Sequence, residues 1–254
     1  MRFDGKHVVV TGASRGIGRA VAEAFASAGA RLTILADDPA ITQAAKEIAR
    51  SGSSAVSPIH CDIADRAAVQ AAFAGFDAVD VLVNNAGLER LTPVRSTDAA
   101  TLDTYHRIID INVNGSFWVT HAVLPHMKRG GRIIFTASIW GKSVEAEFAA
   151  YCASKHAVIG LTRVLAKELG KDGITVNAVC PGYTDTDILR ASVANVVGKT
   201  GRSEADALAE FSSANPQRRI VQPAEVADAV RWLCGEGAAS VTGQSVSVSG
   251  GEVM

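Results

Sequence analysis

The sequence has few aromatic residues and no excess of either charge. Phe, Trp and Tyr make up 6% of the 254 residues, and 25 basic and 26 acidic side chains leave a formal net charge of -1. Such a balance gives no electrostatic reason to expect nucleic acid or an anionic membrane as partner. We therefore expect a small-molecule partner. The abundant alanine and glycine favour close packing of helices against a sheet.

Cysteines are also few and scattered. Cys61, Cys152, Cys180 and Cys234 form no C-x-x-C pair, and no histidine stands at metal-ligand spacing. The pattern predicts neither a disulfide framework nor a metal site. The start MRFDGKHVVVTG carries charges up to a run of three valines, which is too short for a secretory signal or a membrane span. We therefore expect reduced thiols and a cytoplasmic location.

What the sequence does contain is a regular alternation of short β-branched runs with longer alanine-rich segments. This alternation is typical of βαβ units in a mainly parallel sheet. It predicts strands at 7–11, 31–35, 55–60, 79–83, 132–137, 174–179 and 244–249, and main helices at 17–29, 40–51, 65–74, 98–129, 150–171 and 223–236. No linker or internal repeat interrupts it. We predict an α/β fold: a single doubly wound Rossmann domain over 1–254, whose seven-stranded, mainly parallel sheet is flanked by helices on both faces.

The segment from Tyr183 to Gln222 departs from this alternation. It holds two weak helical patterns around 198–201 and is too long for a simple connection. The length favours a substrate lid, with a solvated surface excursion as the alternative. Its basic residues could meet a carboxylate or a phosphate, or simply be solvated; they are Arg190, Lys199, Arg202, Arg218 and Arg219.

A glycine-rich loop, TGASRGIG, follows the first predicted strand directly. Gly12, Gly16 and Gly18 allow a tight turn and a close approach of the backbone to a pyrophosphate, whose charge is favoured at the N-terminus of the next helix. The spacing G-x-x-x-G-x-G differs from the G-x-G-x-x-G of the general dinucleotide fingerprint. Its place between a strand and a helix nevertheless predicts a dinucleotide site.

Asp37 stands at the end of the second predicted strand, 19 residues after Gly18. A carboxylate there can accept hydrogen bonds from the adenosine ribose, and it would repel a 2'-phosphate. Asp38 adds to that repulsion, whereas Arg15 in the glycine loop could pair with a phosphate. We weigh the two acids above the arginine and predict NAD, with NADP as the alternative. Asp37 could also cap the helix that starts near Pro39.

Further motifs follow in order: Asp62 in CDIAD, NNAG at 84–87, Asn112 in INVNG, Ser138 in TASIW, Tyr151 and Lys155 in YCASK, and PGYTDT at 181–186. With the glycine loop, this series resembles the shorter members of the short-chain dehydrogenase/reductase family over essentially the whole chain. The resemblance implies an NAD(P)-dependent short-chain alcohol dehydrogenase or ketoreductase, which interconverts a secondary alcohol and a ketone by hydride transfer.

The cofactor-binding residues that the resemblance implies are Gly12, Ser14, Arg15, Gly16, Ile17, Gly18, Asp37, Asp62, Ile63, Asn84, Ala86, Gly87, Tyr151, Lys155, Pro181, Gly182, Thr184 and Thr186. Asn84 and Asn85 could instead close a turn after a buried strand.

Tyr151 and Lys155 stand four residues apart in a predicted helix. Oxidation of an alcohol requires a group that removes the hydroxyl proton, and a tyrosine with an ordinary pKa near 10 is rarely ionised at neutral pH. Residues four apart share one face of a helix, so the Lys155 ammonium is expected to favour the phenolate. The resemblance makes this pair the acid/base catalyst, with Lys155 also binding the nicotinamide ribose.

Ser138 and Asn112 complete the predicted catalytic set. Ser138 ends the fifth predicted strand, at the carboxyl edge of the sheet where such folds bind ligands. Its hydroxyl can donate to the substrate oxygen and stabilise developing charge, or it can cap the strand end. By resemblance, Asn112 in the long fourth helix holds a water that links the lysine to solvent. A redox sensor without turnover would not need Ser138, Tyr151 and Lys155 together.

The substrate is expected to contact Ser138, Trp140, Glu89, Phe148, Tyr151 and Tyr183. Their aromatic rings favour an apolar or partly aromatic substrate, while Glu89 or Glu145 could bind a hydroxyl or an amine, or face water. The length of the lid resembles that of hydroxybutyrate dehydrogenases and hydroxyacyl-type relatives. This implies a 3-hydroxyacid-type or related secondary alcohol, with polyols, sugars and cyclic alcohols as alternatives.

The helices at 98–129 and 150–171 are rich in Ala, Val and Leu on more than one face. Such helices are expected to bury one side on the sheet and another on a partner subunit. The family resemblance implies a homotetramer. Ser249 stands where relatives usually have Asp, which puts a local contact in doubt.

Overall fold

The computed structural model describes residues 1–52 and 55–254. Seven strands form one parallel sheet in the order β3-β2-β1-β4-β5-β6-β7. The strands are β1 (His7–Thr11), β2 (Arg31–Ala36), β3 (Val56–His60), β4 (Val79–Asn84), β5 (Met127–Thr136), β6 (Thr175–Pro181) and β7 (Ser245–Val248). The predicted doubly wound parallel sheet is confirmed. The strand order reverses beside β1, where β4 pairs with its other edge.

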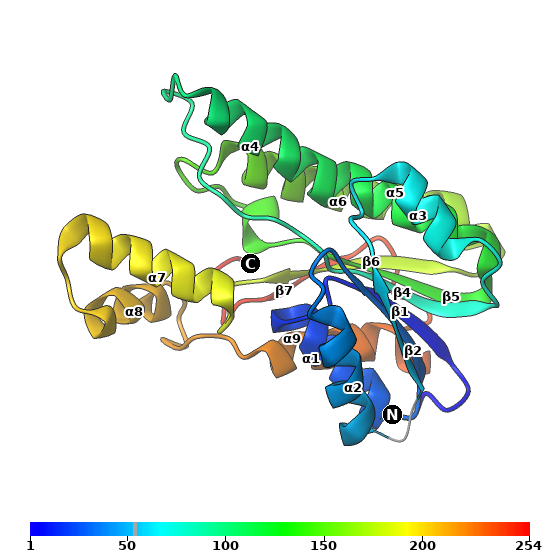
Figure 1. The fold of residues 1–254 in the computed structure, drawn as a ribbon. Helices are drawn as coiled ribbons and strands as arrows, with labels where there is room; N and C mark the ends of the chain where they lie inside the picture. Colours follow the sequence, from blue (N-terminus) through cyan, green and yellow to red (C-terminus); the bar gives the residue numbers. More distant parts are fainter. Residues whose placement is uncertain (53–54) are drawn as a thin grey trace.

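Helices cover both faces of the sheet (Figure 1). One face carries α1 (Gly16–Ser27), α2 (Ile41–Ser51) and α9 (Pro223–Leu233), and the other carries α3 (Arg66–Phe73), α4 (Ala99–Ile109), α5 (Ser116–Val123) and α6 (Ala149–Leu169). Within the described part of the chain, no helix combines the length and the apolarity needed to cross a bilayer.

β1 explains why the apolar runs of this sequence form strands. All five of its residues, HVVVT, are buried, as expected for a central parallel strand that is covered on both faces. Val8 and Val10 pack into the core beneath α1 and α9, whereas Val9 packs into the opposite core with residues of α3, α5 and α6. Successive side chains of a strand point to opposite faces, so one run of valines supplies both cores.

The predicted helix at 98–129 is helical as far as His126 but wrong at its end. It consists of α4, a π-helical stretch (Asp110–Gly115), α5 and a single 3-10 turn (Leu124–His126), after which β5 begins at Met127. Pro125 has no N–H to continue an α-helix, and its ring clashes with the preceding turn. Met127 already pairs with Val79 of β4, ahead of a shift in register. The strand therefore starts earlier than predicted, and the helix ends earlier.

The segment from Tyr183 to Gln222 folds into two helices, α7 (Asp187–Thr200) and α8 (Glu204–Ser213). Gly201 adopts φ 68° and ends α7, and the Ser203 hydroxyl caps α8 by accepting a hydrogen bond from Asp206 N. Leu189, Val193 and Ala207 form a small core between the two helices. The pair projects beyond the end of the sheet (Figure 1), and we call it the lid.

Candidate active site

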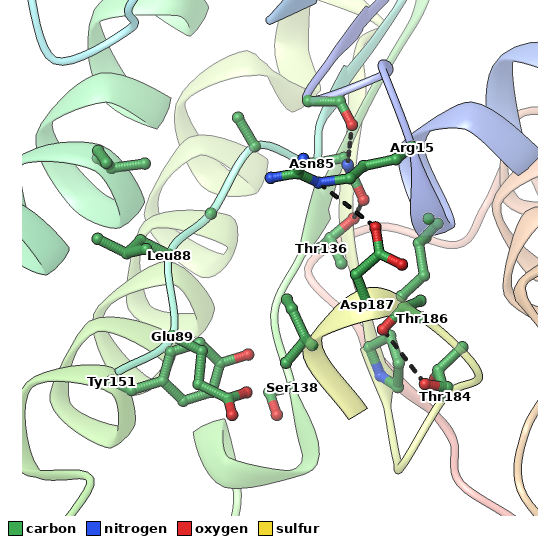
Figure 2. A pocket seen from close by; sticks show the side chains of 18 of the residues that line it. Arg15, Asn85, Leu88, Glu89, Thr136, Ser138, Tyr151, Thr184, Thr186 and Asp187 are labelled. Carbon is green, nitrogen blue, oxygen red and sulfur yellow. Dashed lines mark hydrogen bonds and ion pairs between the residues drawn. The ribbon is translucent and has the colours of Figure 1, made fainter. Parts of the chain in front are cut away.

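A long cleft lies at the carboxyl edge of the sheet, and all strands from β1 to β6 lead residues into it. Most of the predicted site residues line it, from the glycine loop at one end to Ser138, Tyr151 and Tyr183 at the other. Four predicted residues do not: Gly18, Asn84, Asn112 and Phe148. Figure 2 shows the cleft with the loop after β4 on one side and the start of the lid on the other.

The glycine loop is held against the loop that follows β4. Gly12 adopts φ +65°, and a Cβ there would lie 2.7 Å from Ala86 Cα. A Cβ on Gly18 would collide with the carbonyl oxygen of Gly12 and with the Asn85 amide. Larger residues would therefore push the two loops apart. The close backbone approach that a pyrophosphate requires is present, so the residues of this cradle fit a dinucleotide.

Asn85, which the sequence analysis did not assign to the site, fixes this cradle. Its Nδ2 donates to the carbonyl oxygens of Thr11 (3.1 Å) and Gly12 (3.2 Å), and its Oδ1 accepts from the Thr136 hydroxyl at 3.2 Å (Figure 2). Asn84, which was assigned, points the other way and donates to Thr120 Oγ1 at 2.9 Å. Asn84 and Asn85 are neighbours at a strand end, so their side chains lie on opposite faces. Asn85 and not Asn84 therefore braces the glycine loop, and the predicted cofactor contact of Asn84 stays a prediction.

Asp37 is exposed and lines the cleft directly after β2. No described residue donates a side-chain hydrogen bond or ion pair to its carboxylate. The capping role predicted for Asp37 is absent, since no side chain caps α2; Asp38 Oδ1 accepts from Ala40 N, just before that helix, at 2.9 Å. The Arg15 guanidinium lies 3.4 Å from the carboxylate of Asp38, in the loop after β2, and 3.8 Å from that of Asp187, in the lid.

Asp62 and Ile63 follow β3, as predicted, and both line the cleft. Asp62 Oδ1 accepts from Ala64 N at 3.0 Å, and Oδ2 forms a 2.7 Å ion pair with Arg107 of α4. Ile63 fills the space that a side chain at position 115 would need, so it packs closely on Gly115. At the far edge, the Thr186 hydroxyl donates to Thr184 O at 3.3 Å (Figure 2).

Tyr151 and Lys155 lie on the face of α6 that turns toward the cleft, and Lys155 Nζ lies 5.4 Å from the centre of the Tyr151 ring. Nζ donates to Thr136 O at 2.8 Å. Burial lowers the pKa of Lys155 to about 8, and the charge of Glu89 opposes this change. An amine with this pKa is still mostly protonated at pH 7.

The pKa of Tyr151 moves in the direction opposite to the prediction. Burial raises it well above 10, the charge of Glu89 raises it further, and a hydrogen bond with Ser138 only partly opposes this. Desolvation, which disfavours the charged phenolate, is the largest cause. Without a bound cofactor, Tyr151 is therefore a neutral phenol.

Ser138 lies two residues beyond the end of β5, and its side chain faces the same part of the cleft as Tyr151 (Figure 2). Its Oγ accepts a hydrogen bond from Trp140 N at 3.2 Å and caps the 3-10 turn Ile139–Gly141. The capping alternative predicted for Ser138 is present, and the donation to a substrate oxygen stays a prediction. The cap leaves the hydroxyl hydrogen available to a ligand.

Asn112 lies behind Lys155, in the π-helical stretch rather than in a regular helix. Its Oδ1 accepts from Leu88 N at 2.8 Å, and its Nδ2 donates to Leu88 O at 3.0 Å and Ser154 Oγ at 2.9 Å. Both amide hydrogens are thus used within the protein. Asn112 ties the loop after β4 to α6, and the water that was predicted on it stays a prediction.

Aromatic rings wall the outer end of the cleft. The ring centre of Trp140 lies 4.8 Å from that of Phe148, 5.8 Å from that of Tyr151 and 6.1 Å from that of Tyr183. Phe148 packs on Trp140 and does not line the cleft, and its predicted contact with substrate stays a prediction. Tyr183 also packs on Phe211 of α8, at 4.8 Å, so the wall is continuous with the lid.

Comparison with known proteins identifies the class that this fold and site define. A family model described as Enoyl-(Acyl carrier protein) reductase matches residues 12–252. The chain is 36% identical to oxidoreductase UcpA of Salmonella typhimurium (100% of this chain, 96% of that protein) and 35% identical to 3-oxoacyl-[acyl-carrier-protein] reductase FabG of Escherichia coli (100% of both). The chain belongs to the short-chain dehydrogenase/reductase family and is an oxidoreductase of the kind that binds a nicotinamide dinucleotide.

Solved relatives carry the same fold. L-sorbose reductase from Gluconobacter frateurii, in complex with NADPH and L-sorbose, superposes with a TM-score of 0.92 at 28% identity, over 99% of this chain and 98% of that one. Together with it, three other solved relatives hold NADP or NADPH.

Proposed function

We propose that the protein interconverts a secondary alcohol and a ketone, with a nicotinamide dinucleotide as hydride carrier. The observation that carries the proposal is the meeting of the Ser138 and Tyr151 hydroxyls and the Lys155 amine at one end of a cleft whose other end is the glycine cradle. When bound, the cofactor supplies or accepts the hydride. Gly12, Asn85 and Asp37 lie where its phosphates and adenosine ribose would be held.

In this proposal Tyr151 exchanges the proton and Ser138 orients the reacting oxygen. For ketone reduction, the neutral phenol is the form that donates a proton, and the raised pKa of Tyr151 keeps it protonated. The Ser138 hydroxyl donates a hydrogen bond to the same oxygen and stabilises its developing charge. For alcohol oxidation, Tyr151 must first lose its proton, and the Lys155 ammonium is the nearby positive charge that favours this.

For the cofactor we propose NAD. The Asp37 carboxylate is free to accept hydrogen bonds from the ribose hydroxyls, and a phosphate at that point would meet both Asp37 and Asp38. NADP is the second candidate, favoured by the solved relatives that hold NADP or NADPH. Measured kcat/KM with NAD and with NADP decides between them.

For the substrate we propose an uncharged secondary alcohol or its ketone. The predicted 3-hydroxyacid needs a partner for its carboxylate, but basic residues of the lid region are already paired with acids, as Arg190–Asp185, Arg202–Glu210 and Arg219–Glu225. Trp140 and Tyr183 offer an apolar surface instead. A 3-hydroxyacid remains one of the compounds to assay.

The test is the absorbance of the reduced nicotinamide at matched concentrations of secondary alcohols with NAD or NADP, and of ketones with the reduced cofactors. We expect turnover with wild-type protein and almost none with Tyr151→Phe, which should still bind cofactor. A panel without any turnover, or a Tyr151→Phe variant with near-normal kcat, would contradict the proposal.

We also propose that the protein is a single-domain subunit of a homotetramer. Exposed apolar side chains on α4, α5 and α6 support an interface there: Leu102, Tyr105, Phe117 and Val164. Light scattering coupled to gel filtration measures the number of subunits. Localisation in the cytoplasm stays a prediction.

A further inference from the structure

Glu89 places a carboxyl group beside the proposed catalytic residues. It is the second residue after the NNAG segment, and its side chain lies in the cleft on the same side as Tyr151 (Figure 2). Its charge acts on both Tyr151 and Lys155, raising the pKa of each. The carboxyl group is therefore part of the space that a reacting ligand would enter.

This carboxyl group has no protein partner. Among residues 1–52 and 55–254, no side chain or backbone N–H donates a hydrogen bond to it, and no cation lies within ion-pair distance. The neighbouring Arg90 instead donates to the backbone carbonyl of Glu89, at 2.8 Å. Burial raises the pKa of the Glu89 carboxyl to about 7, opposed by the charges of Lys155 and Arg90. An unpaired carboxyl group that is partly buried in a cleft is available to accept a hydrogen bond from a ligand.

The surroundings of Glu89 restrict what its partner can be. The described residues contain no group of three or more His, Cys, Asp and Glu side chains that could hold a metal ion with it. A substrate carboxylate would meet a like charge there. A hydroxyl group, in contrast, donates one hydrogen bond to a carboxylate and adds no charge to a site that already holds Lys155.

We propose that Glu89 selects substrates with a second hydroxyl group on the carbon next to the reacting carbon, so that vicinal diols and α-hydroxy ketones are preferred. This inference rests on the proposed function, because the first oxygen must lie between Ser138 and Tyr151. Glu89 lines the cleft together with these two residues and its charge acts on Tyr151, so the second oxygen that we expect it to meet is one close to the first along the substrate. In oxidation the diol gives its carbinol hydrogen as hydride to the oxidised cofactor and its hydroxyl proton to Tyr151, leaving an α-hydroxy ketone and the reduced cofactor. The second hydroxyl keeps its proton and donates it to Glu89 as a hydrogen bond.

The experiment compares trans-1,2-cyclohexanediol with cyclohexanol, which share a ring and differ by one hydroxyl group. A hydrogen bond to a charged group contributes about 1.5–3 kcal/mol, so wild-type protein should prefer the diol by about 10- to 100-fold in kcat/KM. Glu89→Leu should lower that preference at least about tenfold, and Glu89→Gln, which keeps an acceptor without the charge, should lie between. Glu145→Gln is the matched control, because Glu145 does not line the cleft and its loss should leave the ratio unchanged.

Three outcomes would overturn the proposal: a wild-type ratio near one, a ratio that survives Glu89→Leu, or a stronger preference for trans-2-aminocyclohexanol, which would assign an amine to Glu89. The ratio is measured within each variant, so a general loss of activity does not imitate the result. If a Glu89 variant is poorly folded, dissociation constants of 2-hydroxycyclohexanone and cyclohexanone for the wild-type complex with reduced cofactor give the same comparison. No turnover with any alcohol would refute the proposed function, whereas turnover without diol preference would refute only the role of Glu89.

Discussion

Replacement of Glu89 by glutamine should stabilise the protein above pH 7 and change it little below pH 4.5. The unfolded chain releases the proton of this carboxyl near pH 4.5, whereas the folded protein holds it until about pH 7. Between these values the unfolded state binds fewer protons, so stability falls as the pH rises. At about 1.4 kcal/mol per pH unit, the free energy of unfolding of the wild-type protein falls by about 3 kcal/mol over this range, and that of the glutamine variant does not.

The assay is urea unfolding of both proteins without cofactor, at pH 4.5 and pH 8 and at equal protein concentration. At each pH, the free energy of unfolding of the wild type is subtracted from that of the variant. The measured quantity is how much this difference changes between the two pH values. Glu252, whose pKa burial also raises to about 7, is present in both proteins and therefore cancels. Glu145→Gln serves as the control that should show no such change. A difference that is the same at both pH values, within about 0.5 kcal/mol, would refute the desolvation of Glu89.

Three further substitutions test the rest of the site. Tyr151→Phe should retain the fold and the dissociation constant for NAD but lose nearly all turnover. Stopped-flow measures the turnover and fluorescence titration measures the dissociation constant. A normal kcat would remove Tyr151 from the acid/base role. Asp37→Ser should raise the kcat/KM for NADP relative to NAD by about tenfold or more, since it removes a charge opposite the 2'-phosphate; an unchanged ratio would assign cofactor choice elsewhere. Asn85→Ala should cost about 1–3 kcal/mol of stability and raise the KM for cofactor, because it leaves the carbonyl oxygens of Thr11 and Gly12 without their donor; a variant with wild-type unfolding and KM would show that the cradle does not depend on this amide.

The alternation of strands and helices could be predicted because each parallel strand must be apolar on both faces. In β1 every residue is buried, so HVVVT is a continuous run that periodicity finds easily. In the predicted helix at 98–129, the end was misplaced and the π-helical stretch was not foreseen, because the backbone hydrogen bonding changes there without a mark in the sequence. Only Pro125 signals its end.

The site was predictable where residue type alone carries the chemistry and less so where orientation does. Tyr151, Lys155 and Ser138 lie together as expected. Asn84 and Asn85 are chemically identical, and only the pleat of the strand decides which one faces the cleft. The direction of the pKa shift of Tyr151 was misjudged for a related reason. Spacing along a helix indicates that a cation is near, but it does not indicate how far burial desolvates the phenol.

One residue at the end of β5 connects the two ends of the cleft. The hydroxyl of Thr136 holds Asn85, which braces the glycine cradle, while its carbonyl oxygen accepts the hydrogen bond from Lys155 Nζ. The glycine cradle and Lys155 are therefore held by the same residue. A substitution that disturbs this strand end is therefore expected to lower cofactor affinity and turnover together.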